Sequence, residues 1–309
     1  MSTPEFGVST LQQLVREQYA IVGVVCQPDK PVGRGLRVAA PPVKLAAQNL
    51  GVPVLQFANL RDAPAIRAIE ALQPDLILVA AYGQYIPDEI VAVPPRGCLN
   101  LHPSLLPRWR GAAPATAAIL AGDAETGVTV HFVVSQMDAG DILAQERTPI
   151  RADDTTATLM ARLGEWGAAV YLDTVAHWLR GEITPRAQDH SQATWCGRMT
   201  KAEGKLDWTR AAGELARQVR AFQPWPGAFT FWQTQQLDIL EATPLDAWRG
   251  DAVPGQVIVT DAGLLVAAGR GALRLRRVQL AGRRALGAEE FLRGARDLAG
   301  TVLGDRQGG

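Results

Sequence analysis

The stretch Leu76–Tyr82 reads LILVAAY and gives the strongest fold signal in the chain. It is apolar on both faces and of strand length, which is typical of a strand buried inside a parallel sheet. Other strand-like segments alternate with helix-like ones on either side of it. The strand-like segments are Ile21–Cys26, Val52–Gln56, Cys98–His102 and Gly127–Val134, and the helix-like ones are Pro42–Leu50, Ile66–Leu72, Ala113–Ala121 and Ala157–Leu179. This alternation predicts an α/β fold whose parallel sheet carries helices on both faces.

The composition is that of an ordinary globular protein. The 309 residues include 31 Lys+Arg and 31 Asp+Glu, and 47% are hydrophobic. The apolar fraction excludes a disordered or collagen-like chain, and the zero net charge argues against a protein that binds polyanions over its whole surface. The three cysteines lie far apart, so we expect no thiolate zinc site and no disulfide framework. Without a signal peptide or an apolar run of about 18 residues, we expect a cytoplasmic protein with no membrane partner.

The rhythm of strands and helices breaks at residues 185–203, which we interpret as a linker between two domains, 1–184 and 204–309. This stretch is polar and shows little periodicity. A helix at Ala211–Phe222 follows it. After that helix come short strand-like segments spaced like those of a small β-barrel, at Ala228–Trp232, Leu237–Ala242, Gly255–Thr260, Leu264–Ala268 and Leu273–Leu280.

The densest cluster of chemically useful residues follows the predicted strand Cys98–His102. Asn100 and His102 are two residues apart, so in a strand both side chains lie on one face. Pro103 then ends the strand. In a parallel sheet the functional site lies beyond the carboxyl ends of the strands, where this amide and imidazole would emerge together. They could polarise a carbonyl group and stabilise an oxyanion.

A second cluster, DAGDIL at Asp138–Leu143, follows the strand at Gly127–Val134. Asp138 could orient His102, raise its pKa or position a water molecule. Plainer interpretations stay open, because an Asn-x-His pair can be incidental and DAGD can be a simple turn. We assign His131 to a structural role within its strand. We expect no metal, because no two histidines have the spacing of a zinc protease motif.

The motifs identify a family. The segments NLHPSLLPRWRGAAP (Asn100–Pro114), AGDAETGVTVH (Ala121–His131) and DAGDIL closely resemble the methionyl-tRNA formyltransferase family. The resemblance extends upstream to QPDKPVGRGLRVAAPPVK (Gln27–Lys44) and AAYGQYIP (Ala80–Pro87). Downstream it includes KAEGKLDW (Lys201–Trp208) and VRAFQPWPGAF (Val219–Phe229), and it covers the chain from Thr3 to about Leu303.

The resemblance implies a fold, an activity and partners. Residues 1–184 would be a Rossmann-like catalytic domain, and residues 204–309 an OB-like β-barrel that binds tRNA. The enzyme would transfer the formyl group of 10-formyltetrahydrofolate to the free α-amino group of initiator methionyl-tRNA. Attack by that amine makes a tetrahedral oxyanion, which needs hydrogen-bond donors already in place. We expect a cytoplasmic monomer without a metal.

The resemblance also implies roles for individual residues. Asn100 and His102 would hold the formyl carbonyl and its oxyanion, and Asp138 would support His102 and the movement of the proton. The expected folate-binding residues are Ser104, Leu105, Leu106, Pro107, Tyr82, Gly83, Ile86 and Pro87. Arg34 is similar to the arginine that reaches the acceptor end of the tRNA, and we add Arg37, Lys44, Arg276 and Arg277 as further tRNA-binding residues on grounds of charge.

One departure from the family concerns the first strand. The family has a strand and a glycine before the Thr-Pro-acidic-Phe segment, and here Met1-Ser2 stand in their place. The resemblance makes that strand central in the sheet. Its loss would leave backbone groups of two neighbouring strands unpaired, at about 1–3 kcal/mol for each buried group. We therefore expect the natural chain to begin upstream of this Met1.

Other functions remain open at the level of sequence. Between Arg270 and Arg296 eight arginines face two acids, Glu289 and Glu290, which suits an RNA backbone but also an ordinary solvated surface. Within enzymes, the alternatives are a formyltransferase for an amino sugar and a 10-formyltetrahydrofolate hydrolase domain. An RNA-binding protein with an inactive catalytic domain is a third alternative. A nicotinamide-dependent oxidoreductase is disfavoured, because Gly33-Arg34-Gly35 lacks the third glycine of the dinucleotide fingerprint.

Overall fold

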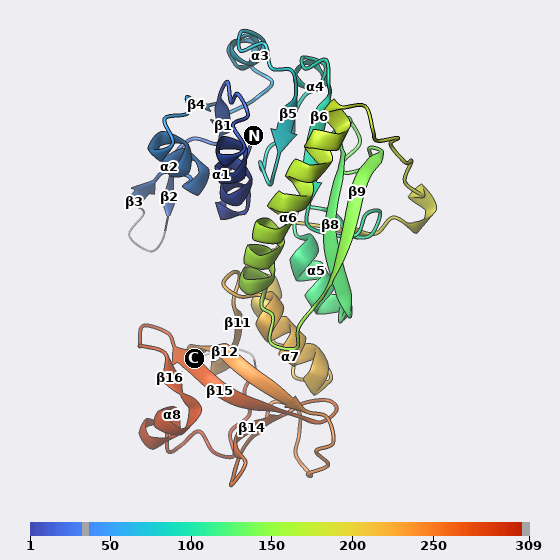
Figure 1. Cartoon of the computed structure of the whole chain (residues 1–309). Coiled ribbons are helices and arrows are strands. Elements are labelled where there is room, and N and C mark those ends of the chain that lie inside the picture. The colour runs from blue at the N-terminus through green and yellow to red at the C-terminus, as the bar shows by residue number, and fades with distance from the viewer. Residues whose placement is uncertain (33–36, 305–309) are drawn as a thin grey trace. The chain divides into compact units, whose positions relative to one another are not determined.

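A computed structural model describes residues 1–32 and 37–304 of the chain (Figure 1). The chain divides into two compact units. Unit 1 comprises Met1–Pro114, Glu125–Pro149 and Thr158–Gly197, and unit 2 comprises Ala115–Ala124, Ile150–Ala157 and Arg198–Gly309. Among the described residues, no helix is both long and apolar enough to cross a membrane.

Unit 1 alternates short strands with helices, as the sequence predicts. Its helices are α1 (Val8–Arg16), α2 (Pro42–Asn49), α3 (Ala63–Glu70), α4 (Asp88–Val91) and α6 (Thr156–Leu179), with 3₁₀ turns at Glu5–Gly7 and His190–Gln192. Its strands are β1 (Val24–Cys26), β2 (Lys30–Val32), β3 (Arg37–Ala39), β4 (Val54–Gln56), β5 (Ile77–Val79), β6 (Cys98–His102), β7 (Arg110–Gly111), β8 (Glu125–Phe132), β9 (Ile142–Pro149) and β10 (Trp195–Cys196).

The strands of unit 1 pair in both directions. The expected parallel pairing is present between β1 and β4 and between β5 and β6. In contrast, β8 runs antiparallel to β6, and β9 runs antiparallel to β8. The sheet that carries the candidate site therefore has the order β5-β6-β8-β9 and is mixed rather than purely parallel.

Between β1 and β5 the sheet of unit 1 is interrupted. The described residues form no strand there, and Met1 and Ser2 lie between the two parts (Figure 1). The backbone amide of Ser2 donates to the carbonyl of Val25 at 3.1 Å, and the backbone amide of Ala80 donates to the carbonyl of Met1 at 3.0 Å. A cavity of about 600 Å³ adjoins them, lined by side chains of α1, β1, β5 and α6. Burial lowers the pKa of the Met1 amine to about 6.

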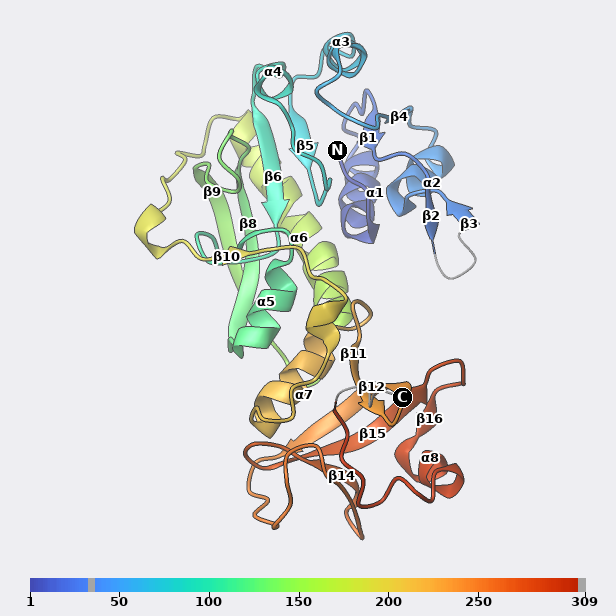
Figure 2. The same ribbon diagram turned by 180° about the vertical axis from the view of Figure 1, so that it is seen from behind.

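Helix α6 covers one face of β6 and β8, as Figure 1 and Figure 2 show from opposite sides. Two features fix it there. Gly167 faces the side chains of Val128 and Leu101, so that helix and sheet pack closely. The buried Tyr171 hydroxyl donates to the carbonyl of Leu99 at 2.7 Å and accepts from the amide of Val79 at 3.1 Å. One hydroxyl therefore ties the helix to β6 and to β5.

The segment expected to be a linker, residues 185–203, has a structured first part. Its strand β10 pairs in parallel with β7. Arg186 forms an antiparallel bridge with Ile142, the first residue of β9. The boundary between the compact units falls between Gly197 and Arg198. The residues that precede this boundary thus belong to the hydrogen-bonded framework of unit 1.

Unit 2 is a sheet with helices around one apolar core. Its strands are β11 (Ala228–Trp232), β12 (Gln235–Leu245), β13 (Val257–Thr260), β14 (Gly263–Ala267), β15 (Ala272–Leu280) and β16 (Leu286–Gly287), with helices α7 (Ala212–Ala221) and α8 (Ala288–Gly294), a 3₁₀ turn at Ala202–Gly204 and most of α5 (Pro114–Ala121). The strand order is β11-β12-β15-β14-β13, so the two edge strands are not paired with each other. Isolated bridges link the C-terminal segment to Phe231 and Gln256, beside those two edges.

The expected absence of disulfides agrees with the cysteines, since Cys26, Cys98 and Cys196 are all free and buried. The turn Gly269–Gly271 joins β14 and β15, which are antiparallel neighbours.

The double hydrogen bond of Tyr171 leads to a first prediction. Tyr171→Phe keeps the ring but leaves the amide of Val79 and the carbonyl of Leu99 without this partner inside the protein. Each buried group that loses its partner costs about 1–3 kcal/mol. We expect the free energy of unfolding, measured by urea denaturation with circular dichroism, to fall by at least about 1 kcal/mol.

Tyr85→Phe is the matched control, because the Tyr85 side chain is 47% exposed. We expect this control to change the unfolding free energy by less than about 0.5 kcal/mol. If the two variants had equal stability, the hydroxyl of Tyr171 would not hold α6 against the sheet.

Candidate functional site

The register of β6 against β8 builds the centre of the candidate site. Asn100 lies directly opposite His131, and His102 lies opposite Thr129. Residues two apart in a strand share a face, and directly paired residues of neighbouring strands also lie side by side. The three side chains of Asn100, His102 and His131 therefore gather on one face of the sheet, near the carboxyl end of β6.

His102 is buried, and a hydrogen bond to the backbone fixes its tautomer. Its Nε2 lies 2.9 Å from the carbonyl oxygen of Trp109. Because a carbonyl oxygen can only accept, Nε2 carries the proton and donates it to this bond. Nδ1 is left to face Asp138, whose Oδ1 lies 3.7 Å away. Nδ1 is therefore the ring atom of His102 that can take up a further proton.

Asp138 is fixed through its backbone and through its carboxylate. Its φ of 50° lies in the left-handed region, which is unfavourable for residues other than glycine. Its Oδ2 accepts a hydrogen bond from the amide of Gly111 at 2.8 Å. Gly111 has to be a glycine, because a Cβ there would lie 2.2 Å from the carbonyl oxygen of Cys196. The pairing of β7 with β10 thus positions the backbone amide of Gly111 against the carboxylate of Asp138.

Gln188 and Arg110 form a second layer behind Asp138. The Gln188 amide donates to the carbonyls of Asp138, at 2.9 Å, and Gly140, at 2.7 Å. Arg110, which is 1% exposed, donates to Oε1 of Gln188 through Nε and one terminal nitrogen. Burial lowers the pKa of the Arg110 guanidinium, and the nearby Asp138 carboxylate opposes that shift. Sequence reasoning missed this layer, because Gln188 lies in the expected linker.

His131 belongs to the site, whereas the sequence analysis assigned it to the strand alone. Its Nδ1 lies 2.8 Å from the carbonyl oxygen of Phe132, and its Nε2 lies 3.1 Å from Nδ2 of Asn100. The same Nε2 is 3.7 Å from Oδ1 of Asp138. Burial lowers the pKa of His131 to about 4, with the Asp138 carboxylate pulling in the opposite direction. The alternation of polar and apolar residues in GVTVHFVV was the available signal, since it puts Thr129 and His131 on one face.

The side chains of His102, His131 and Asp138 also have the composition of a metal site. One ligand atom from each lies within 4.8 Å of the others. The imidazoles of His102 and His131 each donate the N–H of one ring nitrogen to a backbone carbonyl and keep the other nitrogen as a possible ligand, as metal-binding histidines commonly do. However, the lone pair of His131 Nε2 already accepts from Asn100, so a metal ion would have to displace that hydrogen bond.

The segment Ser104–Pro107, expected to bind folate, is fixed directly after β6. Ser104 is buried, and its hydroxyl donates to the carbonyl of Arg108 at 2.6 Å. The hydroxyl of Thr129 donates to the carbonyl of Ser104 and accepts from the amide of Leu106. Gln145 donates to the carbonyl of Leu106 at 2.8 Å. The loop is therefore pinned to β8 and β9, while Leu105 and Pro107 stay partly exposed.

The other expected folate residues lie in the loop after β5. The side chains of Tyr82 and Ile86 belong to an apolar cluster, and Pro87 is buried beside them. Burial raises the pKa of Tyr82 to about 12. Gly83 is exposed and has a φ of 84°. A ligand that reaches this loop would meet the backbone around Gly83 rather than the ring of Tyr82.

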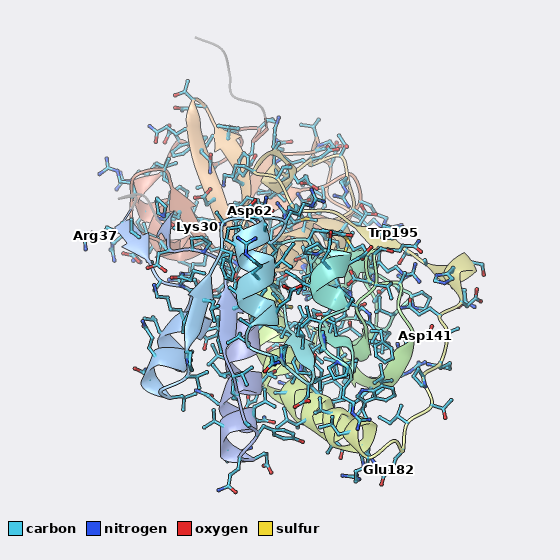
Figure 3. All side chains as sticks on the ribbon, turned by 90° about the horizontal axis from the view of Figure 1, so that it is seen from above. Lys30, Arg37, Asp62, Asp141, Glu182 and Trp195 are labelled. Carbon is cyan, nitrogen blue, oxygen red and sulfur yellow. The ribbon has the colours of Figure 1, made fainter. Side chains whose placement is uncertain are left out.

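The residues expected to bind tRNA are placed in different parts of the chain. Arg34 lies outside the described residues. Figure 3 shows Arg37 and Lys30 on the β2–β3 arm, across unit 1 from Asp141, which follows Asp138 in the same loop. Lys44 forms an ion pair within unit 1, since its Nζ lies 2.8 Å from both carboxylate oxygens of Asp29.

Arg276 and Arg277 are adjacent in β15, yet both are exposed. The register between β12 and β15 shifts on both sides of the pair Glu241–Arg277, and Arg276 is an extra residue in β15, which breaks the usual alternation of faces. A terminal guanidinium nitrogen of Arg277 lies 3.6 Å from Oε1 of Glu241. Beside it, a cavity of about 300 Å³ has a lining that includes Arg274, Arg276, Arg293, Glu289 and Glu290.

Comparison with known proteins places the chain in a family. The formyl transferase family model matches residues 2–175, and the model of the formyl transferase C-terminal domain matches residues 198–296. The chain is 45% identical over 306 residues to the methionyl-tRNA formyltransferase of Roseiflexus sp. (strain RS-1), covering 99% of this chain and 94% of the relative. It is 45% identical over 302 residues to that of Methylococcus capsulatus, covering 98% and 97%.

Solved structures share the fold. The N-formyltransferase of Helicobacter canadensis, in complex with folinic acid and dTDP-3-aminofucose, matches with a TM-score of 0.67 at 16% identity, covering 89% of this chain and 97% of that one. The fold and the near full-length identity agree. The chain therefore belongs to the formyl transferase family and, within it, to the methionyl-tRNA formyltransferases.

Proposed function

We propose that this protein transfers the formyl group of 10-formyltetrahydrofolate to the free α-amino group of initiator methionyl-tRNA. The observation that carries the proposal is the convergence of Asn100, His102 and Asp138 at the carboxyl end of β6. Two kinds of similarity support it: the relatives with this name match nearly the full length of the chain, and a solved relative binds folinic acid.

The proposed reaction is an acyl transfer. The neutral amine attacks the formyl carbon, a new C–N bond forms and the carbonyl oxygen becomes an oxyanion. A peptide α-amino group titrates near 7.7–8.0, so a neutral fraction exists at physiological pH. When the tetrahedral intermediate collapses, the bond between the formyl carbon and the folate nitrogen breaks. The amine loses a proton and the folate nitrogen gains one, so no other reactant is needed.

The site residues suit this charge movement. Asn100 and protonated His102 would donate hydrogen bonds to the oxyanion as it forms. Nδ1 of His102 is free to carry the proton, because Nε2 is committed to the carbonyl of Trp109. Asp138, 3.7 Å from Nδ1, would stabilise the imidazolium through its negative charge. The buried position of His102 strengthens this attraction, because few water molecules screen it.

Substrate binding completes the proposal. The loop Ser104–Pro107 and the loop Tyr82–Pro87 would bind the folate, and Arg34, Arg37, Lys44, Arg276 and Arg277 would contact the tRNA. We further propose that unit 2 acts as an OB-like barrel, since the C-terminal segment bridges to residues beside both sheet edges. A monomeric state, a cytoplasmic location and domain limits at 184 and 204 belong to the same proposal.

The test of function is a transfer assay with labelled 10-formyltetrahydrofolate and three acceptors. We expect formylation of methionyl-tRNA and little or none of free methionine or an amino-sugar nucleotide. Formylation of the amino-sugar nucleotide alone would refute the proposal, and release of formate without an acceptor would point to a hydrolase.

The catalytic roles predict a split between turnover and binding. Removing one preorganised oxyanion donor typically costs about 10²–10³-fold in rate. Asn100→Ala and His102→Ala should therefore lower kcat by about that factor, while the dissociation constant of the folate donor changes little. Asp138→Asn keeps an acceptor for the Gly111 amide but removes the charge, and we expect a similar loss of kcat. Single-turnover kinetics and fluorescence titration with folate measure the two quantities.

His177→Ala serves as the control, because His177 lies on α6 with its side chain 44% exposed and contacts the surface residues Asp173, Glu182 and Arg180. Its kcat should match that of the wild type. A variant at Asn100 or His102 that kept near-normal turnover would remove that residue from the mechanism.

The basic surface of unit 2 predicts salt-dependent tRNA binding. The double variant Arg276→Glu, Arg277→Gln should weaken tRNA binding and make the plot of log Kd against log salt shallower by about one for each lost phosphate contact. Glutamine replaces Arg277 so that no acid faces Glu241. Filter binding over a range of salt concentrations measures the effect.

Arg16→Glu on α1 is the control for net charge, since the Arg16 side chain is 72% exposed and far from β15 in sequence. Folate affinity should stay constant in both proteins. Unchanged tRNA affinity in the double variant would exclude Arg276 and Arg277 from the RNA-binding surface.

A further inference from the structure

The imidazole of His131 makes one hydrogen bond through each ring nitrogen. Nδ1 lies 2.8 Å from the carbonyl of Phe132, which can only accept, so this nitrogen carries the proton. In the neutral ring Nε2 then has a lone pair, and it faces Nδ2 of Asn100 at 3.1 Å. The backbone of β8 thus determines that His131 presents an acceptor to Asn100.

An asparagine amide has a donor end and an acceptor end of nearly the same shape. Turning the Asn100 amide over would put Oδ1 against the lone pair of His131 Nε2, with no proton between two acceptors. The imidazole of His131 is 1% exposed, so water cannot easily relieve such a contact. In the orientation present, one N–H of the amide bonds to His131 and the second N–H remains for another acceptor.

We propose that His131 is a positioning residue that fixes the Asn100 amide with its NH₂ group toward the oxygen of the transferred formyl group. This inference rests on the proposed formyl transfer. With the amide reversed, the carbonyl of Asn100 would meet the oxyanion and repel it. His131 acts through Asn100 and does not itself touch the substrate.

The environment of His131 keeps its Nε2 an acceptor at neutral pH. Burial lowers the pKa of His131 to about 4, and the neighbouring His102 and Arg110 lower it further, while Asp138 and the hydrogen bond to Phe132 oppose them. The ring is therefore neutral over the range in which the enzyme would work. The lone pair that holds Asn100 is present throughout that range.

The test is a double-mutant cycle between His131 and Asn100. His131→Leu removes the acceptor while filling much of the space, and His131→Gln can offer an amide oxygen in its place. Each is made in the wild-type protein and in Asn100→Ala. Misplacement of a reacting group by about 1 Å can cost 10²-fold in rate, so we expect His131→Leu to lower kcat about 10- to 100-fold.

The pattern across the cycle identifies a positioning role. The KM for the folate donor should change by less than about threefold, and His131→Gln should recover most of the lost kcat, because it can restore the acceptor. In the Asn100→Ala background, His131→Leu should have almost no further effect, because the group that His131 positions is gone. Val130→Ala is the structural control, since Val130 is buried on the opposite face of β8. It should lower the Tm and leave kcat unchanged.

Three results would overturn the proposal. They are an unchanged kcat in His131→Leu, an equal loss with and without Asn100, and His131→Gln as slow as His131→Leu. If the leucine variant does not fold, His131→Met replaces it, because a thioether is only a weak acceptor. A wild-type protein that transfers no formyl group would refute the proposed function, whereas an active wild type with an additive cycle would refute only the role of His131.

Discussion

The antiparallel pairing of β6 with β8 is the constraint on which the site depends. Its register puts His131 opposite Asn100 and Thr129 opposite His102. A shift by one residue would turn the polar side chains of one strand to the other face. The same pairing lets Thr129 hold the loop after β6 through the carbonyl of Ser104 and the amide of Leu106. The chemistry and the expected folate loop are thus fixed by one pair of strands.

Backbone groups, more than side-chain packing, set the protonation of the site. The carbonyls of Trp109 and Phe132 each accept from one imidazole and so define which ring nitrogen carries a proton. The amide of Gly111 holds the carboxylate of Asp138, whose left-handed backbone costs about 1–3 kcal/mol. Gln188 offsets part of that cost by bonding the carbonyls of Asp138 and Gly140. Such preorganised dipoles need no rearrangement when charge develops.

The local sequence pattern predicted the positions of helices and strands well, but it predicted poorly which strands pair with one another. Strand β6 was expected at Cys98–His102 and lies there, and α6 was expected within one residue of its observed start. The antiparallel direction of β8 was missed, because alternation shows which residues share a face but not which strand pairs with which. For the same reason His131 looked structural, since its partner Asn100 is 31 residues away. Gln188 could not be recognised as a site residue from the sequence, because its side chain contacts Arg110, Asp138 and Gly140, which are at least 48 residues away.

The central claim is that backbone carbonyls fix the tautomers of His102 and His131, so that Nδ1 of His102 faces Asp138 and Nε2 of His131 faces Asn100. Long-range ¹H–¹⁵N correlation spectra of the ¹⁵N-labelled full chain report the tautomer of each histidine, and His→Gln variants assign the signals. At neutral pH, our account predicts a proton on Nε2 of His102 and on Nδ1 of His131. A His131 ring protonated on Nε2, or a neutral His102 ring protonated on Nδ1 alone, would contradict it.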